Sequence, residues 1–126
     1  MPFKVEIDPR RALVIMVFHG RFTDDDLIAA TEAIRVHPDF RPEFDQLVLG
    51  HEPGVLEVTR EGIQKITVAA PIFAPTSRRA IVAPTAASYG MARMFELTRD
   101  GRAGEVRVFQ SEDEALVWLD LIPNQP

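Results

Sequence analysis

Polar side chains able to do chemistry gather where the apolar segments of this sequence end. His19 and His51 follow two such segments, and the hydroxyl-bearing stretch 85–89 follows a third. In open α/β sheets, ligands bind in the crevice at the carboxyl ends of parallel strands. The residues selected on this basis as candidate ligand-binding residues are His51, Thr85, Ser88, Tyr89 and Arg93.

Each candidate also has an ordinary structural interpretation. Free N–H groups at a helix start near 85–88 suit an anion, but helix capping explains the same residues. Tyr89 and Arg93 are four residues apart and share a helix face, where they would bind a phosphate, an acidic partner or each other. The two histidines lack a third ligand, so we predict no metal site, no cofactor and no assigned catalytic residue.

Composition excludes several classes of function. The chain has 126 residues, a net charge of −5 and no cysteine. Disulfides, thiolate metal sites and a cysteine nucleophile are therefore excluded. The acidic balance argues against a nucleic-acid partner. The amino-terminal residues do not resemble a secretory signal, and the longest apolar run, 12–18, is too short for a transmembrane segment, so we expect a cytoplasmic protein.

The hydrophobic pattern alternates between strands and helices. Strands are predicted at 3–7, 12–18, 44–49, 80–83 and 106–109, with Gly20 and Gly50 closing the second and third. Helices are expected to start at Thr23, at Thr59, near 85–88 and at Ser111. This order, β-β-α-β-α-β-α-β-α, predicts an α/β fold with a five-stranded mixed, mostly parallel sheet and four helices. We expect one domain over 1–126, with an ordered core of about 3–121.

Two parts of the second half carry a family resemblance. They are RRAIVAP at 78–84 with YGMARMF at 89–95, and VRVF at 106–109 with EALVWL at 114–119. These segments resemble the SpoIIAA-like family, also described as STAS/SEC14-like. The resemblance implies a STAS fold with helices stacked along the sheet. It does not imply one activity, because many members of the family have no assigned role.

The best-understood STAS proteins are anti-sigma-factor antagonists that switch by phosphorylation. Their switch is a serine at the start of the helix after the third strand, and the added charge blocks binding. When Gly62 is matched to the glycine of the family's Asp-Ser-Ser-Gly pattern, the serine positions hold Arg60 and Glu61. Thr59 is one position early and is interpreted as a helix cap. We therefore predict no phosphorylation site.

Three hypotheses about function remain open. The first is a non-catalytic protein-interaction or regulatory module. We expect it to be a homodimer, since strand 12–18 is apolar on both faces and helices on a single face would leave the other uncovered. The second is a carrier of a lipid or another apolar small molecule, gated by residues 55–56 and 71–73. The third is a small enzyme that uses His51 near Thr85 and Ser88.

Overall fold

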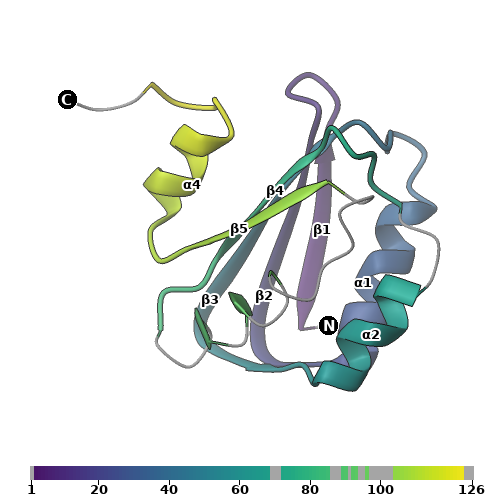
Figure 1. Cartoon of the computed structure of the whole chain (residues 1–126), viewed down its shortest axis with the longest axis vertical. Helices are drawn as coiled ribbons and strands as arrows, with labels where there is room; N and C mark the ends of the chain where they lie inside the picture. The colour runs from purple at the N-terminus through teal and green to yellow at the C-terminus, as the bar shows by residue number, and fades with distance from the viewer. Residues whose placement is uncertain are drawn as a thin grey trace.

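The computed structural model of the protein describes residues 2–68, 72–85, 89–90, 92–93, 96 and 104–123 (Figure 1). Its elements, in chain order, are β1 (Phe3–Asp8), β2 (Leu13–Thr23), α1 (Asp24–Arg35), β3 (Asp45–Glu57), α2 (Arg60–Val68), β4 (Arg78–Val82), β5 (Glu105–Phe109) and α4 (Glu112–Trp118). The five strands form one sheet in the order β1-β2-β3-β4-β5. Only β1 is antiparallel to its neighbour. The predicted five-stranded, mostly parallel α/β sheet is thus confirmed.

The number of helices differs from the four expected. Three helices, α1, α2 and α4, are assigned within the described residues. The predicted third helix falls mostly outside that part of the chain. The backbone is helical at its described residues, which are Tyr89, Gly90, Ala92, Arg93 and Glu96.

Two strands continue past the glycines that were expected to end them. Strand β2 runs through Gly20 to Thr23, and β3 runs through Gly50 as far as Glu57. The register shifts between Phe18 and Gly20, after which residues 20–23 pair with 54–57. Gly20 has φ +64, which suits a β-bulge. The glycines therefore mark an irregularity inside a long strand pair rather than its end.

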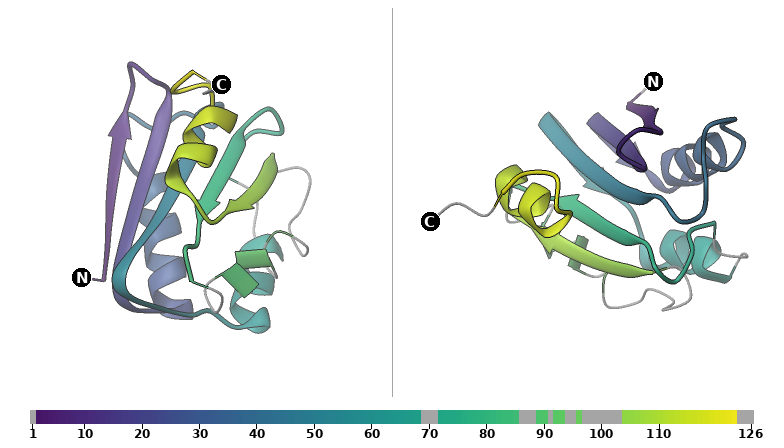
Figure 2. Two further views of the ribbon diagram at one scale, coloured as in Figure 1. Left: turned by 90° about the vertical axis from the view of Figure 1, so that its left-hand side faces the viewer. Right: turned by 90° about the horizontal axis from the view of Figure 1, so that it is seen from above.

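Alternate side chains of β2 enter different cores on the two faces of the sheet. Met16 and Phe18 belong to a cluster that includes Ala30 of α1. Leu13 belongs to another cluster, with Ala115 and Leu119 from the α4 end of the chain. Figure 2 shows α1 and α4 on opposite sides of the sheet. Helix α4 therefore covers part of the second face, so the condition from which a homodimer was expected, helices on a single face, is not met.

Helix α1 begins as the sequence predicts. Thr23 is its N-cap, and the Asp26 carboxylate accepts hydrogen bonds from the Thr23 backbone N (2.8 Å) and Oγ1 (3.0 Å). The acidic first turn suits the positive end of the helix dipole. Ser111 caps α4, and its side chain accepts a hydrogen bond from the Glu114 backbone N, as expected.

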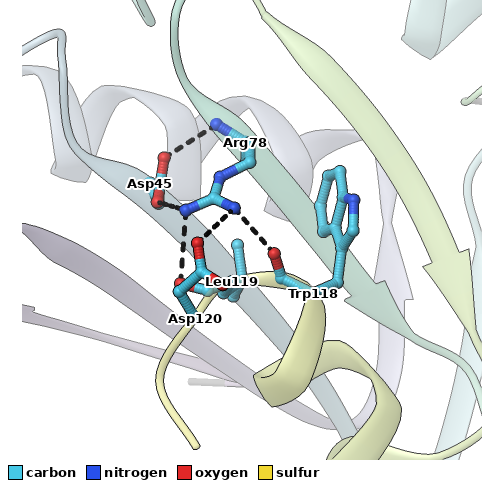
Figure 3. A network of polar contacts seen from close by, with 5 residues as sticks. All are labelled: Asp45, Arg78, Trp118, Leu119 and Asp120. Carbon is cyan, nitrogen blue, oxygen red and sulfur yellow. Dashed lines mark hydrogen bonds and ion pairs between the residues drawn. The ribbon is translucent and has the colours of Figure 1, made fainter. Parts of the chain in front are cut away.

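The side chain of Arg78, on β4, connects the end of α4 to the sheet through hydrogen bonds (Figure 3). Arg78 Nη1 donates to the Trp118 carbonyl (2.8 Å) and to Asp120 Oδ2 (3.0 Å). Its Nη2 donates to the Leu119 carbonyl (3.3 Å) and lies 3.5 Å from Asp45 Oδ2. A helix of seven residues is too short to be stable alone. The guanidinium supplies partners for carbonyls that the helix end leaves free.

Replacing Arg78 with methionine should destabilise the chain by about 1–3 kcal/mol, because the part-buried carbonyls of Trp118 and Leu119 and one oxygen of Asp45 lose their donor. Equilibrium denaturation in urea measures this change. Arg21→Met is the matched control, since the Arg21–Glu57 ion pair lies on the surface and should contribute little. Equal unfolding midpoints for the two variants would contradict the role given to Arg78.

Candidate functional site

The predicted ligand-binding residues do not form one connected site in the described part of the chain. His51 lies within β3, is exposed, and makes no hydrogen bond or ion pair there with the other candidates. Thr85 is half-buried after β4, and its carbonyl accepts a hydrogen bond from the Tyr89 N (2.9 Å). Arg93 forms its ion pair with Glu96 rather than with Tyr89. The remaining candidate, at position 88, lies outside the described residues.

The two histidines lie on neighbouring strands. His19 is on β2 and His51 on β3, both beside the register shift, and both are exposed. The described residues contain no group of three His, Asp or Glu side chains that could hold a metal ion.

The start of α2 holds a more specific arrangement. Thr59 caps this helix as predicted, since its Oγ1 accepts a hydrogen bond from the Gly62 N (3.0 Å). The Asp24 carboxylate, from the first turn of α1, binds the same threonine. Asp24 Oδ1 accepts from the Thr59 backbone N (2.8 Å), and Oδ2 accepts from Thr59 Oγ1 (2.5 Å). A carboxylate of this chain therefore occupies the positive end of α2.

Gly62 leaves the space that this carboxylate fills. A Cβ atom built at Gly62 would lie 2.2 Å from Asp24 Oδ1 and 2.3 Å from its Cγ. Any larger residue at position 62 would have to displace Asp24. The glycine therefore allows the first turns of α1 and α2 to meet.

Hydrogen bonding sets the charge of this contact. The Thr59 hydroxyl and backbone N–H lower the pKa of Asp24 below its ordinary value of 3.8. Hydrogen bonds to the ionised form favour it, so Asp24 is a carboxylate at neutral pH. Arg60 and Glu61, at the positions matched to the family's serines, are exposed beside it.

Sequence reasoning missed the partnership of Asp24 with Thr59. The dipole of α1 is by itself a sufficient reason for acidic residues at 24–26, and Asp24 and Thr59 are 35 positions apart. Glycine is unfavourable inside a helix, so Gly62 in the first turn of α2 was the available signal of a close contact.

A second unforeseen feature is a half-buried arginine on the α1 side of the sheet. Arg79 Nε donates to Oε1 of Gln46 (3.0 Å), and its Cζ lies 4.5 Å from the centre of the Phe73 ring. Burial lowers the pKa of Arg79 to about 10. Phe73 also packs against Phe40 and is 4% exposed. It is therefore a core residue rather than part of the gate expected in the carrier hypothesis.

The rest of that expected gate is only partly visible. Ile72 is half-buried against the same core, while residue 71 and the side chains of 55–56 lie outside the described part. A hollow of about 390 Å³ lies at the end of α4, lined by Val117, Asp120, Leu121, Ile122 and Pro123. None of the predicted ligand-binding residues lines it. Among the helices described, none is long and apolar enough to cross a membrane.

These features define an α/β protein whose antiparallel hairpin leads into a parallel sheet with helices on both faces. A solved structure has this fold, that of an uncharacterized DUF3478-family protein from Shewanella loihica PV-4, described as SpoIIAA-like. The two chains share 16% sequence identity over 93% of each, with a TM-score of 0.57. The fold expected from the resemblance is thus confirmed. No family model matches the sequence, and no curated protein matches it.

Replacing Asp24 with asparagine should lower stability by about 1 kcal/mol at neutral pH, as expected for loss of a helix cap. Because the folded pKa lies below 3.8, the ionic contribution is complete above that value and is lost as pH falls through the folded pKa. Thermal unfolding of the wild type and the variant should therefore converge in acid. Asp25→Asn, an exposed change in the same turn, is the control. A difference that persists unchanged in strong acid would contradict this account.

Gly62→Ala should lower the free energy of unfolding when residue 24 is aspartate and raise it when residue 24 is alanine. Alanine at an ordinary helical glycine gains about 0.5–1 kcal/mol, but here its Cβ must expel the Asp24 carboxylate. We expect stabilisation in an Asp24→Ala background and a coupling of about 1 kcal/mol in the double-mutant cycle. Gly90→Ala, where nothing lies within 4 Å of the new Cβ, is the control. Additive effects at 24 and 62 would show that the contact is not formed.

Proposed function

We propose that this chain is a non-catalytic protein-interaction module of the STAS type that works without a serine phosphoswitch. The observation that carries the proposal is the Asp24 carboxylate bound to Thr59 at the start of α2. In the STAS proteins that switch, this is the place where phosphorylation adds negative charge. Here the negative charge belongs to a side chain of the protein itself and is present at neutral pH without phosphorylation.

Because the Asp24 carboxylate is part of the chain, the charge at the start of α2 is not expected to change through phosphorylation. Phosphate would have to enter beside Asp24, and like charges repel at this distance. The Thr59 hydroxyl already donates to Asp24 and accepts from Gly62. The neighbouring side chains, Arg60 and Glu61, carry no hydroxyl group. Partner binding at this helix would therefore be constitutive, set by the amounts of the two proteins.

The outward faces of α1 and α2 form the surface that we propose for docking. The two helices lie beside each other on one side of the molecule (Figure 1). Among the described residues, the exposed large hydrophobic side chains are Ile28, 41% exposed, and Val36, 60% exposed. Ile28 lies on α1 and Val36 immediately follows it. Glu32, which is exposed and four residues from each of them, lies on the same helix face, as expected for the polar rim of an interface.

Site-specific photo-crosslinking in the cells that make this protein tests the proposal. A benzophenone amino acid at Glu61 should give a discrete adduct, identified by mass spectrometry, that persists after phosphatase treatment. The same probe at Glu112, exposed on α4, is the matched control. With the purified partner, Ile28→Asp should weaken binding roughly tenfold or more, and Glu112→Ala should not.

Two results would overturn the proposal. One is the same set of adducts from positions 61 and 112, which would indicate chance collisions. The other is a partner that binds only after this chain has been phosphorylated.

A further inference from the structure

We propose that β1 is a self-complementary edge strand through which two copies of this chain join their sheets into one. Strand β1 lies at the outer edge of the sheet, and within the described part of the chain it pairs with β2 alone (Figure 2). The β5 edge is different, because the Val108 N donates to Glu96 Oε2 (2.9 Å) and is thereby occupied. Among the residues that the structure describes, nothing pairs with the outer side of β1, so this edge can accept a further strand.

The register with β2 shows which backbone groups of β1 face outward. The His19 N donates to the Pro2 carbonyl (2.8 Å), which makes this pair a hydrogen-bonded one. Hydrogen-bonded and non-hydrogen-bonded pairs alternate along an antiparallel ladder. Lys4 and Glu6 therefore bond to β2, and Val5 directs its N–H and C=O away from the sheet. Phe3 and Ile7, two residues to either side of Val5, do the same.

A two-fold axis at Val5 would satisfy these outward groups. Val5 would pair with Val5 of the second copy, and Phe3 with Ile7, all as hydrogen-bonded pairs. Lys4 would then lie opposite Glu6 of the second copy, in the closer, non-hydrogen-bonded positions. Both side chains are exposed and already attract one another within the chain, with Nζ and Oε1 2.8 Å apart. When two copies of β1 pair in antiparallel fashion, the positive residue of each copy therefore faces the negative residue of the other.

The charges also select this register over its neighbours. Moving the axis to Lys4 or to Glu6 would place like charges directly opposite each other, which destabilises a strand pair. Moving the axis to a point between two residues would place the outward N–H and C=O groups of one copy opposite residues of the other copy whose backbone groups already bond to β2. An axis at Val5 avoids both like-charge pairs and mismatched hydrogen-bonding groups, and it pairs the most residues.

This dimer differs from the one expected from the apolar strand 12–18. That expectation placed the contact on an uncovered sheet face, which α4 covers in part. Edge pairing extends the sheet sideways and leaves both covered faces intact. A contact through one strand is smaller than a standard interface, so we expect a weak, reversible dimer seen at high micromolar concentration.

Charge reversal provides the sharpest test. Lys4→Glu places a glutamate opposite Glu6 in both pairs across the axis, and Glu6→Lys places a lysine opposite Lys4 in both, so each variant should weaken dimerisation roughly tenfold. The double variant Lys4→Glu/Glu6→Lys restores opposite charges and should dimerise like the wild type. An equimolar mixture of the two single variants should form the heterodimer. Light scattering and sedimentation of the purified full chain measure all four.

A backbone variant tests the hydrogen bonds themselves. Val5→Pro removes an N–H that β2 does not use, and proline is tolerated where the N–H of an edge strand faces solvent. The variant should keep its circular dichroism spectrum and become monomeric. Amide exchange by NMR gives a readout without mutation, because the Phe3, Val5 and Ile7 amides should gain protection as concentration rises.

A wild-type chain that stays monomeric at high micromolar concentration would overturn the proposal. So would a dimer that is indifferent to the single charge reversals and to Val5→Pro, since its interface would lie elsewhere. These measurements use one purified protein and no partner. A negative result for the dimer would therefore say nothing about partner docking at α1 and α2, which the crosslinking experiment tests separately.

Discussion

Strand β2 has apolar side chains on both faces, and the rest of the fold is arranged around covering both. Met16 and Phe18 pack on the α1 side, while Leu13 packs on the α4 side. A cover of seven residues, as in α4, needs an attachment beyond its apolar contacts. Arg78 provides it from β4, by bonding the Trp118 and Leu119 carbonyls at the end of that helix.

The sequence predicted those features that depend on neighbouring residues. Hydrophobic alternation located the five strands, and the caps at Thr23, Thr59 and Ser111 marked three helix starts. Strand ends were misjudged because Gly20 and Gly50 are typical turn residues. Their actual role, in a register shift between β2 and β3, depends on pairing across more than thirty positions. Local pattern carries no information about such pairing.

Contacts between distant segments were likewise beyond local patterns. Periodicity identified the apolar stripe of the last helix, but not the face of the sheet on which that stripe lands. The dipole of α1 alone accounts for an acidic residue at position 24, so nothing in that segment indicated a hydrogen bond between Asp24 and Thr59. The candidate ligand residues were chosen by strand order, which places His51 and Thr85 at the same end of the sheet. Strand order does not direct their side chains toward one another.

At two helix ends, side chains of the protein itself neutralise the charge of the helix dipole. The positive end of α2 receives the Asp24 carboxylate, and the negative end of α4 receives the Arg78 guanidinium. Helix ends are where α/β proteins commonly bind charged ligands. When residues of the chain already fill these positions, a ligand must displace a bonded partner, whereas a protein partner can use the outer surface unchanged. This is the physical reason to favour docking over small-ligand binding at α2.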